Sequence, residues 1–264
     1  MRYCRYSSSE GPQFGLVETV AGVEQITGLL PRTEDGLPDI AHPQKLAARP
    51  LASAQLLAPV QPSKIVCVGR NYLDHAKELG NDAPKEPLIF FKPPSSIIAR
   101  NEIILRPRIS ERVDFEAELA VVIKKNCRNV ADDQDVRPFI LGYTCANDVT
   151  ARDFQKRDGQ WTRAKGFDTF CPVGPLVTDE VDPWRGVGLE TRVNGELRQS
   201  GNTRDFIFAL DVVIRYISRI MTMAPGDLVC TGTPAGVGPL VAGDSVEISI
   251  QGIGMLKNSV VDGD

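Results

Sequence analysis

The sequence has little of what marks nucleic-acid-binding, secreted or membrane-spanning proteins. It contains no basic block and its formal net charge is −4, so a nucleic-acid partner is disfavoured. No apolar run approaches the roughly 18 residues that a membrane-spanning helix needs. The first residues, MRYCRYSSSEG, lack the apolar segment of a signal peptide. We therefore expect a cytoplasmic protein with neither a membrane nor a nucleic acid as its partner.

Paired cysteines are also absent. The six cysteines are spread singly and none forms a C-x-x-C pair, which disfavours a zinc knuckle or a redox motif. Several lie in apolar runs such as VCV, TCA and VCT, where a cysteine acts as a small core residue. This usage suits a reducing compartment better than a secreted protein held together by disulfides.

The chain of 264 residues has an ordinary globular composition, 42% hydrophobic and 24% charged, which excludes a disordered protein. This length allows one to two domains. Residues 1–62 are predicted to form a small N-terminal domain, with short strands in FGLVETV and VEQITGLL. From Pro31 to Pro62 repeated prolines predict an irregular connector. Residues 63–264 are predicted to form the larger, catalytic domain.

The larger domain is predicted to be rich in strands. Apolar or alternating runs predict strands in KIVCVG, PLIFFKP, EIILRP, VDFEAELAVVI and YTCANDV. Asn71 is expected to cap a short helix that Gly80 ends, and a longer helix is expected over Phe206–Met221. Asn194-Gly195 predicts a hairpin turn. Because too few helices are present for parallel crossovers, we expect a β-rich α+β fold with a mixed, rolled or barrel-like sheet.

The segment VDFEAELAVVI (113–123) concentrates acidic side chains. Read as one strand, it points its apolar odd-numbered residues to one face and Asp114, Glu116 and Glu118 to the other. Three carboxylates beside a buried run require a compensating cation, and Asp148 could add a fourth. Oxygen ligands favour Mg²⁺, Mn²⁺ or Ca²⁺ over zinc. An exposed polar face on an edge strand remains the alternative.

The two histidines differ in their surroundings. His42 lies in the proline-rich connector and is expected to be solvated. His75 is followed three residues later by Glu78, so one helical turn would place them together, as a water-activating base requires. An ordinary surface pair is the alternative. The loop TGTPAGVG (231–238) could bind an anion through its N–H groups or be a plain turn, and it lacks the lysine of a P-loop.

Seven segments, taken in order from about Lys64 onward, resemble the fumarylacetoacetate hydrolase family. They are GRNYLDHAKE, EPLIFFKP, DFEAELAVVI, ANDVTARDFQ, AKGFDTFCPVGP, VNGELRQSGNT and PGDLVCTGTPAGVG. The resemblance implies Mg²⁺ or Mn²⁺, with Ca²⁺ possible in a crystal, on Glu116, Glu118 and Asp148, so that Asp114 is not a ligand. It implies a water-activating pair, His75 and Glu78, in a segment that often acts as a lid.

The resemblance also implies further site residues and an activity. Lys165 is the implied catalytic lysine. The implied substrate-binding residues are Arg70, Tyr72, Arg152, Gln155 and Thr233. The implied reaction is metal-dependent hydrolysis of a C–C bond in 3-acylpyruvates or related β-diketo acids, including fumarylpyruvate. Oxaloacetate decarboxylation, tautomerisation, or isomerisation of a hydroxyhepta-diene-dioate could use the same site. The expected partner is an α-keto acid, in a homodimer.

Overall fold

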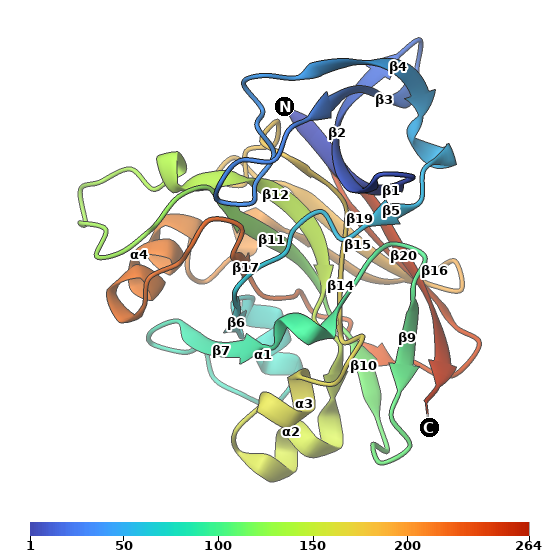
Figure 1. The fold of residues 1–264 in the computed structure, drawn as a ribbon. Coiled ribbons are helices and arrows are strands. Elements are labelled where there is room, and N and C mark those ends of the chain that lie inside the picture. Colours follow the sequence, from blue (N-terminus) through green and yellow to red (C-terminus); the bar gives the residue numbers. More distant parts are fainter. Residues whose placement is uncertain (264) are drawn as a thin grey trace.

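The computed structural model describes residues 1–263, which form three β-sheets with short helices packed around them (Figure 1). Most neighbouring strands are antiparallel, and the parallel pairs are β17 with β6, β8 with β14, and β9 with β20. The predicted β-rich α+β fold is confirmed. Among the described residues none of the three sheets closes into a barrel, so the fold is a set of rolled open sheets.

The largest sheet runs from the N-terminal strands through the centre of the molecule. Its strands in spatial order are β4 (Gln44–Pro50), β3 (Val23–Leu30), β2 (Gly11–Val20), β1 (Arg2–Ser8), β14 (Cys171–Thr178), β12 (Ile140–Asn147), β11 (Ala117–Ile123), β17 (Leu228–Cys230), β6 (Ile65–Gly69) and β7 (Leu88–Lys92). Two short strands lie off this path: β5 (Leu56–Leu57) pairs with β1, and β8 (Ile97–Ile98) pairs with β14.

The N-terminal segment contains more structure than its prolines predict. The two predicted strands correspond to β2 and β3 and are confirmed. The prediction of an irregular connector over 31–62 is wrong in part, because β4 pairs with β3 and β5 pairs with β1. The residues between Pro43 and Pro50 keep their N–H groups and can join a sheet edge. Since β1 is also paired with β14, a domain boundary at residue 62 stays a prediction.

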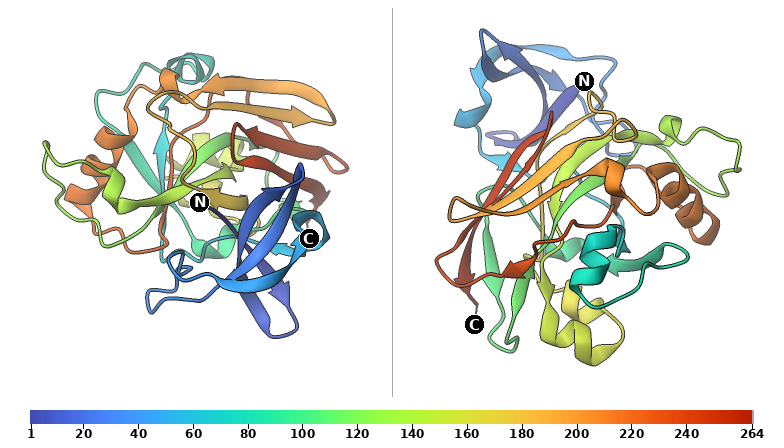
Figure 2. Two further views of the ribbon diagram at one scale, coloured as in Figure 1. Left: turned by 90° about the horizontal axis from the view of Figure 1, so that it is seen from above. Right: turned by 180° about the vertical axis from the view of Figure 1, so that it is seen from behind.

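The remaining strands form two smaller sheets (Figure 2). The five-stranded sheet has the order β16 (Glu196–Asn202), β15 (Gly188–Val193), β19 (Ser245–Ile250), β20 (Gly254–Asp262) and β9 (Ile103–Arg106). The three-stranded sheet has the order β13 (Thr150–Ala151), β10 (Val113–Phe115) and β18 (Gly238–Pro239). The hairpin predicted at Asn194-Gly195 joins β15 to β16, and both turn residues have positive φ angles, 53° and 83°.

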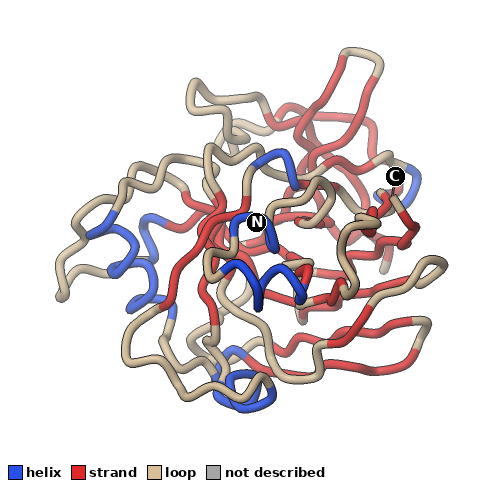
Figure 3. Tube along the Cα trace, turned by 90° about the horizontal axis from the view of Figure 1, so that it is seen from below, coloured by secondary structure: helices blue, strands red, loops and turns tan. Residues whose placement is uncertain are grey.

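The helices are few and short, and they lie at the periphery of the sheets (Figure 3). The α-helices are α1 (Leu73–Glu78), α2 (Arg152–Asp158), α3 (Thr162–Lys165) and α4 (Leu210–Ile220). The 3₁₀ segments are Leu51–Ser53, Pro94–Ser96, Arg137–Phe139 and Thr203–Asp205. None of the described helices is long and apolar enough to cross a membrane. All six cysteines are free and buried, which confirms the core position predicted for several of them.

The central strand of the large sheet, β11, is covered on both faces, which explains why its sequence is almost continuously apolar. Leu119 and Val121 of β11 pack with Val213 and Ile217 of α4 in one core cluster. The alternate residues of the same strand, Ala120 and Val122, belong to a second cluster on the opposite face. Strand β11 is therefore rigidly held by neighbours on every side, and whatever precedes it is fixed in position.

Asn71 has a different role from the helix cap that its sequence predicts. The N-cap of α1 is Tyr72, which has no side-chain cap hydrogen bond. The buried Asn71 amide instead donates to the carbonyl oxygens of Phe208 and Thr231, at 3.2 and 2.8 Å, and accepts from the N–H of Phe208 at 2.8 Å. This contact holds residues 206–209 in a bent, non-helical form, so α4 begins at Leu210 instead of Phe206.

Replacing Asn71 by Ala should lower the free energy of unfolding by about 2–4 kcal/mol, because it leaves buried backbone groups without partners. Urea unfolding followed by circular dichroism measures this. The control is Asn126→Ala at an exposed position, which should stay within about 0.5 kcal/mol of the parent. Equal stability of the two variants would contradict the structural role of Asn71.

Candidate metal centre

The acidic segment is broken at Glu116 into two strands that belong to different sheets. Strand β10 ends at Phe115 and β11 begins at Ala117, so the expected single strand with three carboxylates on one face is wrong. The alternative of an exposed polar face is also wrong, because Asp114, Glu116 and Glu118 are all buried. At the break the N–H of Glu116 donates to the side chain of Asn147 at 3.0 Å.

The register of β11 and β12 brings the carboxylates together. Ala117 lies opposite Asn147, and the N–H of Asp148 donates to the carbonyl oxygen of Glu116 at 2.9 Å. Carboxylate oxygens of Glu116, Glu118 and Asp148 consequently lie within 4.8 Å of one another. Asp114 stands apart from this triad and pairs with Arg112 and Arg152.

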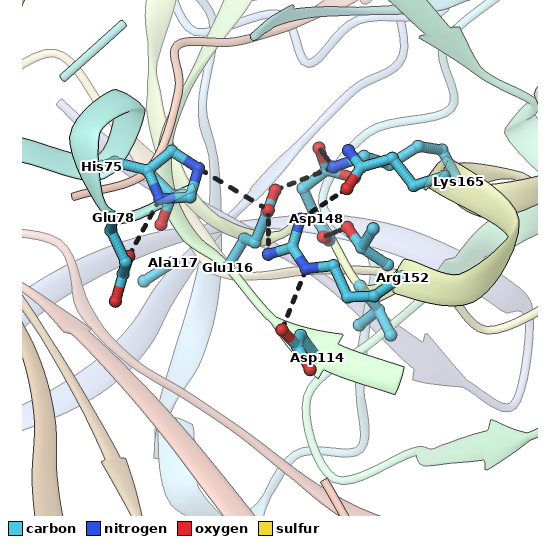
Figure 4. A network of polar contacts seen from close by, with 12 residues as sticks. His75, Glu78, Asp114, Glu116, Ala117, Asp148, Arg152 and Lys165 are labelled. Carbon is cyan, nitrogen blue, oxygen red and sulfur yellow. Dashed lines mark hydrogen bonds and ion pairs between the residues drawn. The ribbon is translucent and has the colours of Figure 1, made fainter. Parts of the chain in front are cut away.

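Two buried lysines and a buried arginine contact the triad. Lys165 Nζ lies 2.8 Å from Glu116 Oε2 and 2.7 Å from Asp148 Oδ2 (Figure 4). Lys92 Nζ lies 2.7 Å from Asp148 Oδ1, and Arg152 Nη2 lies 2.6 Å from Glu116 Oε1. Burial alone would raise the pKa of Glu116, but the charges of Lys165 and Arg152 outweigh it and hold that pKa below its ordinary value.

Glu118 is the triad member that lacks a cationic partner among residues 1–263. Its one hydrogen bond comes from the N–H of Gly232, at 2.8 Å. Burial, together with the nearby charges of Asp148 and Glu116, raises the pKa of Glu118 well above its ordinary value. A buried carboxylate in this position is stabilised by a cation that also touches Glu116 and Asp148. The all-oxygen donor set therefore fits a hard divalent cation.

A histidine faces the triad from helix α1. His75 is buried, its Nδ1 lies 3.3 Å from Glu78 Oε2, and its Nε2 lies 4.0 Å from Glu116 Oε1. The other oxygen of Glu78 accepts a hydrogen bond from the N–H of Gly236 at 3.0 Å. Burial lowers the pKa of His75, and the charges of Glu116 and Glu78 only partly oppose this, so the imidazole is neutral near pH 7.

The loop after β17 binds two carboxylates of the site instead of a free anion. Its N–H groups at Gly232 and Gly236 are used by Glu118 and Glu78. Gly232 has a φ of +99°, and an added Cβ would lie 2.7 Å from the Cβ of Asn71, so this close approach requires glycine. The loop thereby connects β11, which carries Glu118, to helix α1, which carries His75 and Glu78.

A cavity of about 230 Å³ opens over the triad. Of the implied site residues it is lined by Arg70, His75, Glu116, Glu118, Asp148, Gln155, Lys165 and Thr233. Arg152 acts from behind this cavity through Glu116 and Gln155, to which it donates hydrogen bonds. Tyr72 lies outside it: its ring packs edge-on against Phe206, and it lines a separate hollow with Ser200 and Asp205.

The sequence reasoning missed two residues that hold the site. Lys92 donates to Asp148 and to the carbonyl oxygen of Val149. In the sequence it directly follows the apolar run LIFF, and a lysine at the end of such a strand could have suggested a buried charge. Gln199 donates to Thr233 Oγ1 and to the carbonyl oxygen of Pro234, both at 2.8 Å, and accepts from the N–H of Ala117 at 3.1 Å. It lies in an ordinary hairpin strand, and its sequence carries no signal.

Comparison with known proteins identifies the family. The profile described as fumarylacetoacetate (FAA) hydrolase C-terminal matches residues 64–261, and one described as Rv2993c-like, N-terminal matches residues 1–59. The first match covers most of the chain and contains the triad and His75. The chain therefore belongs to the fumarylacetoacetate hydrolase family, as its sequence motifs suggest, and shares the general catalytic role of that family.

Three relatives show the range of reactions within this family. A solved 2-hydroxyhepta-2,4-diene-1,7-dioate isomerase from Mycobacterium marinum is 44% identical, with a TM-score of 0.87 and coverage of 99% of this chain and 98% of that one. Human mitochondrial oxaloacetate tautomerase is 44% identical over 229 residues, 82% of this chain and 73% of its own. Fumarylpyruvate hydrolase from Pseudomonas aeruginosa, solved with Mn²⁺ and pyruvate, is 34% identical, with a TM-score of 0.72 and coverage of 81% and 94%.

Replacing Glu118 by Gln tests the fit of a cation to the triad. Without metal the variant should be more stable than the parent by about 1–3 kcal/mol, because it removes the cost of burying Glu118 either as an unpaired charge or as a carboxyl that has had to take up a proton. Mg²⁺ or Mn²⁺ should raise the unfolding temperature of the parent but not of the variant. Thermal unfolding with and without each metal measures both effects. An equal rise in the two proteins would place the cation elsewhere.

Proposed function

We propose that this protein is a divalent-metal-dependent hydrolase that cleaves a C–C bond in 3-acylpyruvates or related β-diketo acids. The observation that carries the proposal is His75, a neutral imidazole oriented by Glu78, which faces the carboxylate triad beside the charged amine of Lys165. A base and a fixed positive charge on either side of one small cavity are what such a cleavage needs.

Glu116, Glu118 and Asp148 would hold Mg²⁺ or Mn²⁺, and Ca²⁺ fits the same oxygen set. When bound, the cation would act as a Lewis acid toward the oxygens of an α-keto acid. Support comes from the fumarylpyruvate hydrolase of Pseudomonas aeruginosa, whose structure contains Mn²⁺ and pyruvate. The cavity of about 230 Å³ is of a size for a small acid of this kind.

His75 would take the proton from the attacking water. With Nδ1–H donated to Glu78 Oε2, the free lone pair of Nε2 points toward the triad, where the water would lie. Hydroxide adds to the distal carbonyl carbon. The bond between that carbon and the CH₂ carbon of the pyruvate part then breaks. The products are a carboxylic acid and the enolate of pyruvate, which takes up a proton at carbon.

Lys165 would stabilise the charge that develops on the leaving group. Burial would lower the pKa of Lys165, but the charges of Asp148 and Glu116 outweigh it and raise that pKa above its ordinary value. The amine therefore stays protonated throughout the physiological range and can donate to an enolate oxygen. Gln155 and Thr233 face the same cavity and can donate to the substrate carboxylate.

A second candidate is tautomerisation or isomerisation of an unsaturated or β-keto diacid. It is favoured by the higher identity to the oxaloacetate tautomerase and to the isomerase, 44% each, than to the hydrolase, 34%. Here His75 would remove a proton from carbon, and no water would add. Decarboxylation of oxaloacetate would also use the charge of Lys165.

Product analysis separates these reactions. The protein should release pyruvate from acetylpyruvate or fumarylpyruvate in Mg²⁺ or Mn²⁺ and lose this activity in EDTA, because the cation would supply the Lewis acid of the proposed reaction. Turnover is followed by ultraviolet absorbance and by chromatography of the products. Unchanged turnover in EDTA would remove the metal from the reaction. The second candidate would be favoured if the protein accelerated the keto–enol exchange of oxaloacetate but released no pyruvate from acetylpyruvate or fumarylpyruvate.

Replacing His75 by Ala should reduce turnover by about 10²–10⁴-fold, the usual contribution of a general base. Mn²⁺ affinity, measured by calorimetry, should stay within about twofold, because His75 does not touch Glu118 or Asp148. The matched control is Lys77→Ala on the exposed side of the same helix. Turnover of the His75 variant at the parent rate would exclude the role of this residue.

A further inference from the structure

A second hollow lies between the N-terminal strands and the segment that follows them. Its volume is about 470 Å³, and it shares no lining residue with the cavity over the triad. The strands that form it, β1, β2 and β3, lie at the opposite end of the molecule from helices α2 and α3, which carry Arg152 and Lys165 (Figure 1). Arg5 and Arg32 line this hollow, and no carboxylate of the described chain does.

Arg5 lies in an otherwise apolar row that crosses the N-terminal strands. The strand register places Leu57 of β5 on one side of Arg5 and Phe14 of β2 on the other, and Leu30 of β3 follows Phe14. Phe14 and Leu30 are both buried in the second core cluster. Cross-strand neighbours of opposite charge stabilise a sheet, but these neighbours are apolar and cannot neutralise an arginine.

The two arginines have few and long contacts with the protein. The half-buried Arg5 side chain donates one hydrogen bond, from Nη1 to the carbonyl oxygen of Ala58 at 3.4 Å. The exposed Arg32 side chain donates one, to Gln61 Oε1 at 3.5 Å. Both distances exceed the roughly 2.7–3.2 Å of an ordinary N–H···O hydrogen bond. Most of the ten N–H donors of the two guanidinium groups are therefore available to a ligand.

The two guanidinium groups also repel each other. Burial and the nearby charge of Arg32 both lower the pKa of Arg5, although an arginine side chain stays protonated in spite of this. Within residues 1–263 neither Arg5 nor Arg32 forms an ion pair, whereas Arg2 of the same strand pairs with Glu24. An anion between Arg5 and Arg32 would remove their repulsion and supply the counter-charge that the protein does not.

The lining of the hollow indicates the class of anion. Gln61 Oε1 accepts from Arg32, which leaves its NH₂ group as a further donor. The apolar part of the lining comes from Pro12, Phe14, Leu29, Leu30 and Pro31. Two positive charges in one hollow are matched by a single group with two negative charges. A phosphate monoester carries about −1.5 to −2 at pH 7 and has three acceptor oxygens, whereas a carboxylate would neutralise one arginine only.

We propose that Arg5 and Arg32 form a binding site for a phosphate monoester with an apolar body, separate from the metal centre. The site goes beyond the proposed function and does not depend on it, because neither the triad nor His75 takes part. The residues that line the hollow offer no carboxylate, imidazole, thiol or hydroxyl group. The ligand is therefore bound and released without being chemically changed.

Calorimetric titration of the full chain in EDTA tests the site, because without a metal the probes cannot bind through a cation at the triad. The probes are phenyl phosphate, inorganic phosphate, benzoate and the neutral benzyl alcohol. Phenyl phosphate should bind about tenfold or more tightly than benzoate, and benzyl alcohol should not bind. Inorganic phosphate should bind more weakly than phenyl phosphate, because it lacks the apolar body. The affinity should fall as salt rises, because Arg32 is exposed.

Variants assign the binding to the two arginines. Arg5→Met and Arg32→Met should each weaken the binding of phenyl phosphate about tenfold or more, and the double variant should not bind it. Methionine suits the apolar row around position 5, so Arg5→Met should unfold at the temperature of the parent or above it. Phenyl phosphate should raise the unfolding temperature of the parent but not of the double variant. The control is Lys45→Met, which removes an exposed charge on β4 outside the hollow.

Several results would overturn the proposal. They are no binding of phenyl phosphate at millimolar concentration, equal binding by the parent and the double variant, and binding of benzoate as tight as that of phenyl phosphate. A dimer in sedimentation that Arg32→Glu dissociates, without phosphate binding by the parent, would instead assign the arginines to a second copy of the chain and overturn it too. If the double variant does not fold, Arg32→Met at its exposed position decides alone.

Discussion

The structure depends on the burial of several carboxylates next to one another. Left alone, Asp114, Glu116, Glu118 and Asp148 would repel one another and resist removal from water. Lysine and arginine side chains from four different segments neutralise most of this charge, and they do so at distances of 2.6–3.0 Å. Glu118 is the member that the protein itself does not neutralise. The site is thus incomplete in a way that a small hard cation would complete.

The precision of this site comes from the sheet and not from the short helices. Strand β11 is packed on both faces and paired on both edges, so the residues around its start cannot move independently. The break at Glu116 lets one short sequence supply carboxylates to two surroundings: Asp114 to an arginine pair, and Glu116 with Glu118 to the triad. The helices add the polar side chains that face the triad, His75 from α1 and Lys165 from α3.

Much of this could be read from the sequence, and the errors have physical causes. Strands with clear alternation or continuous apolar runs, the Asn194-Gly195 hairpin and the helix-ending Gly80 were predictable because they depend on local preferences. The family motifs supplied the ligand set. The break at Glu116, the strand β4 and the late start of α4 were not predictable, because distant partners decide them: Asn147, β3 and Asn71 respectively. Lys92 and Gln199 act through contacts more than 30 residues away.

Glu78 uses its two oxygens for two different purposes. One orients the imidazole of His75, and the other accepts the N–H of Gly236 in the loop whose Gly232 binds Glu118. Seating of α1 against that loop and alignment of the imidazole therefore happen together. If α1 moved away from the loop, Glu78 would lose its contact with Gly236 and the imidazole of His75 would leave the triad in the same movement. In the proposed reaction, a molecule opened in this way could exchange ligands but could not transfer a proton.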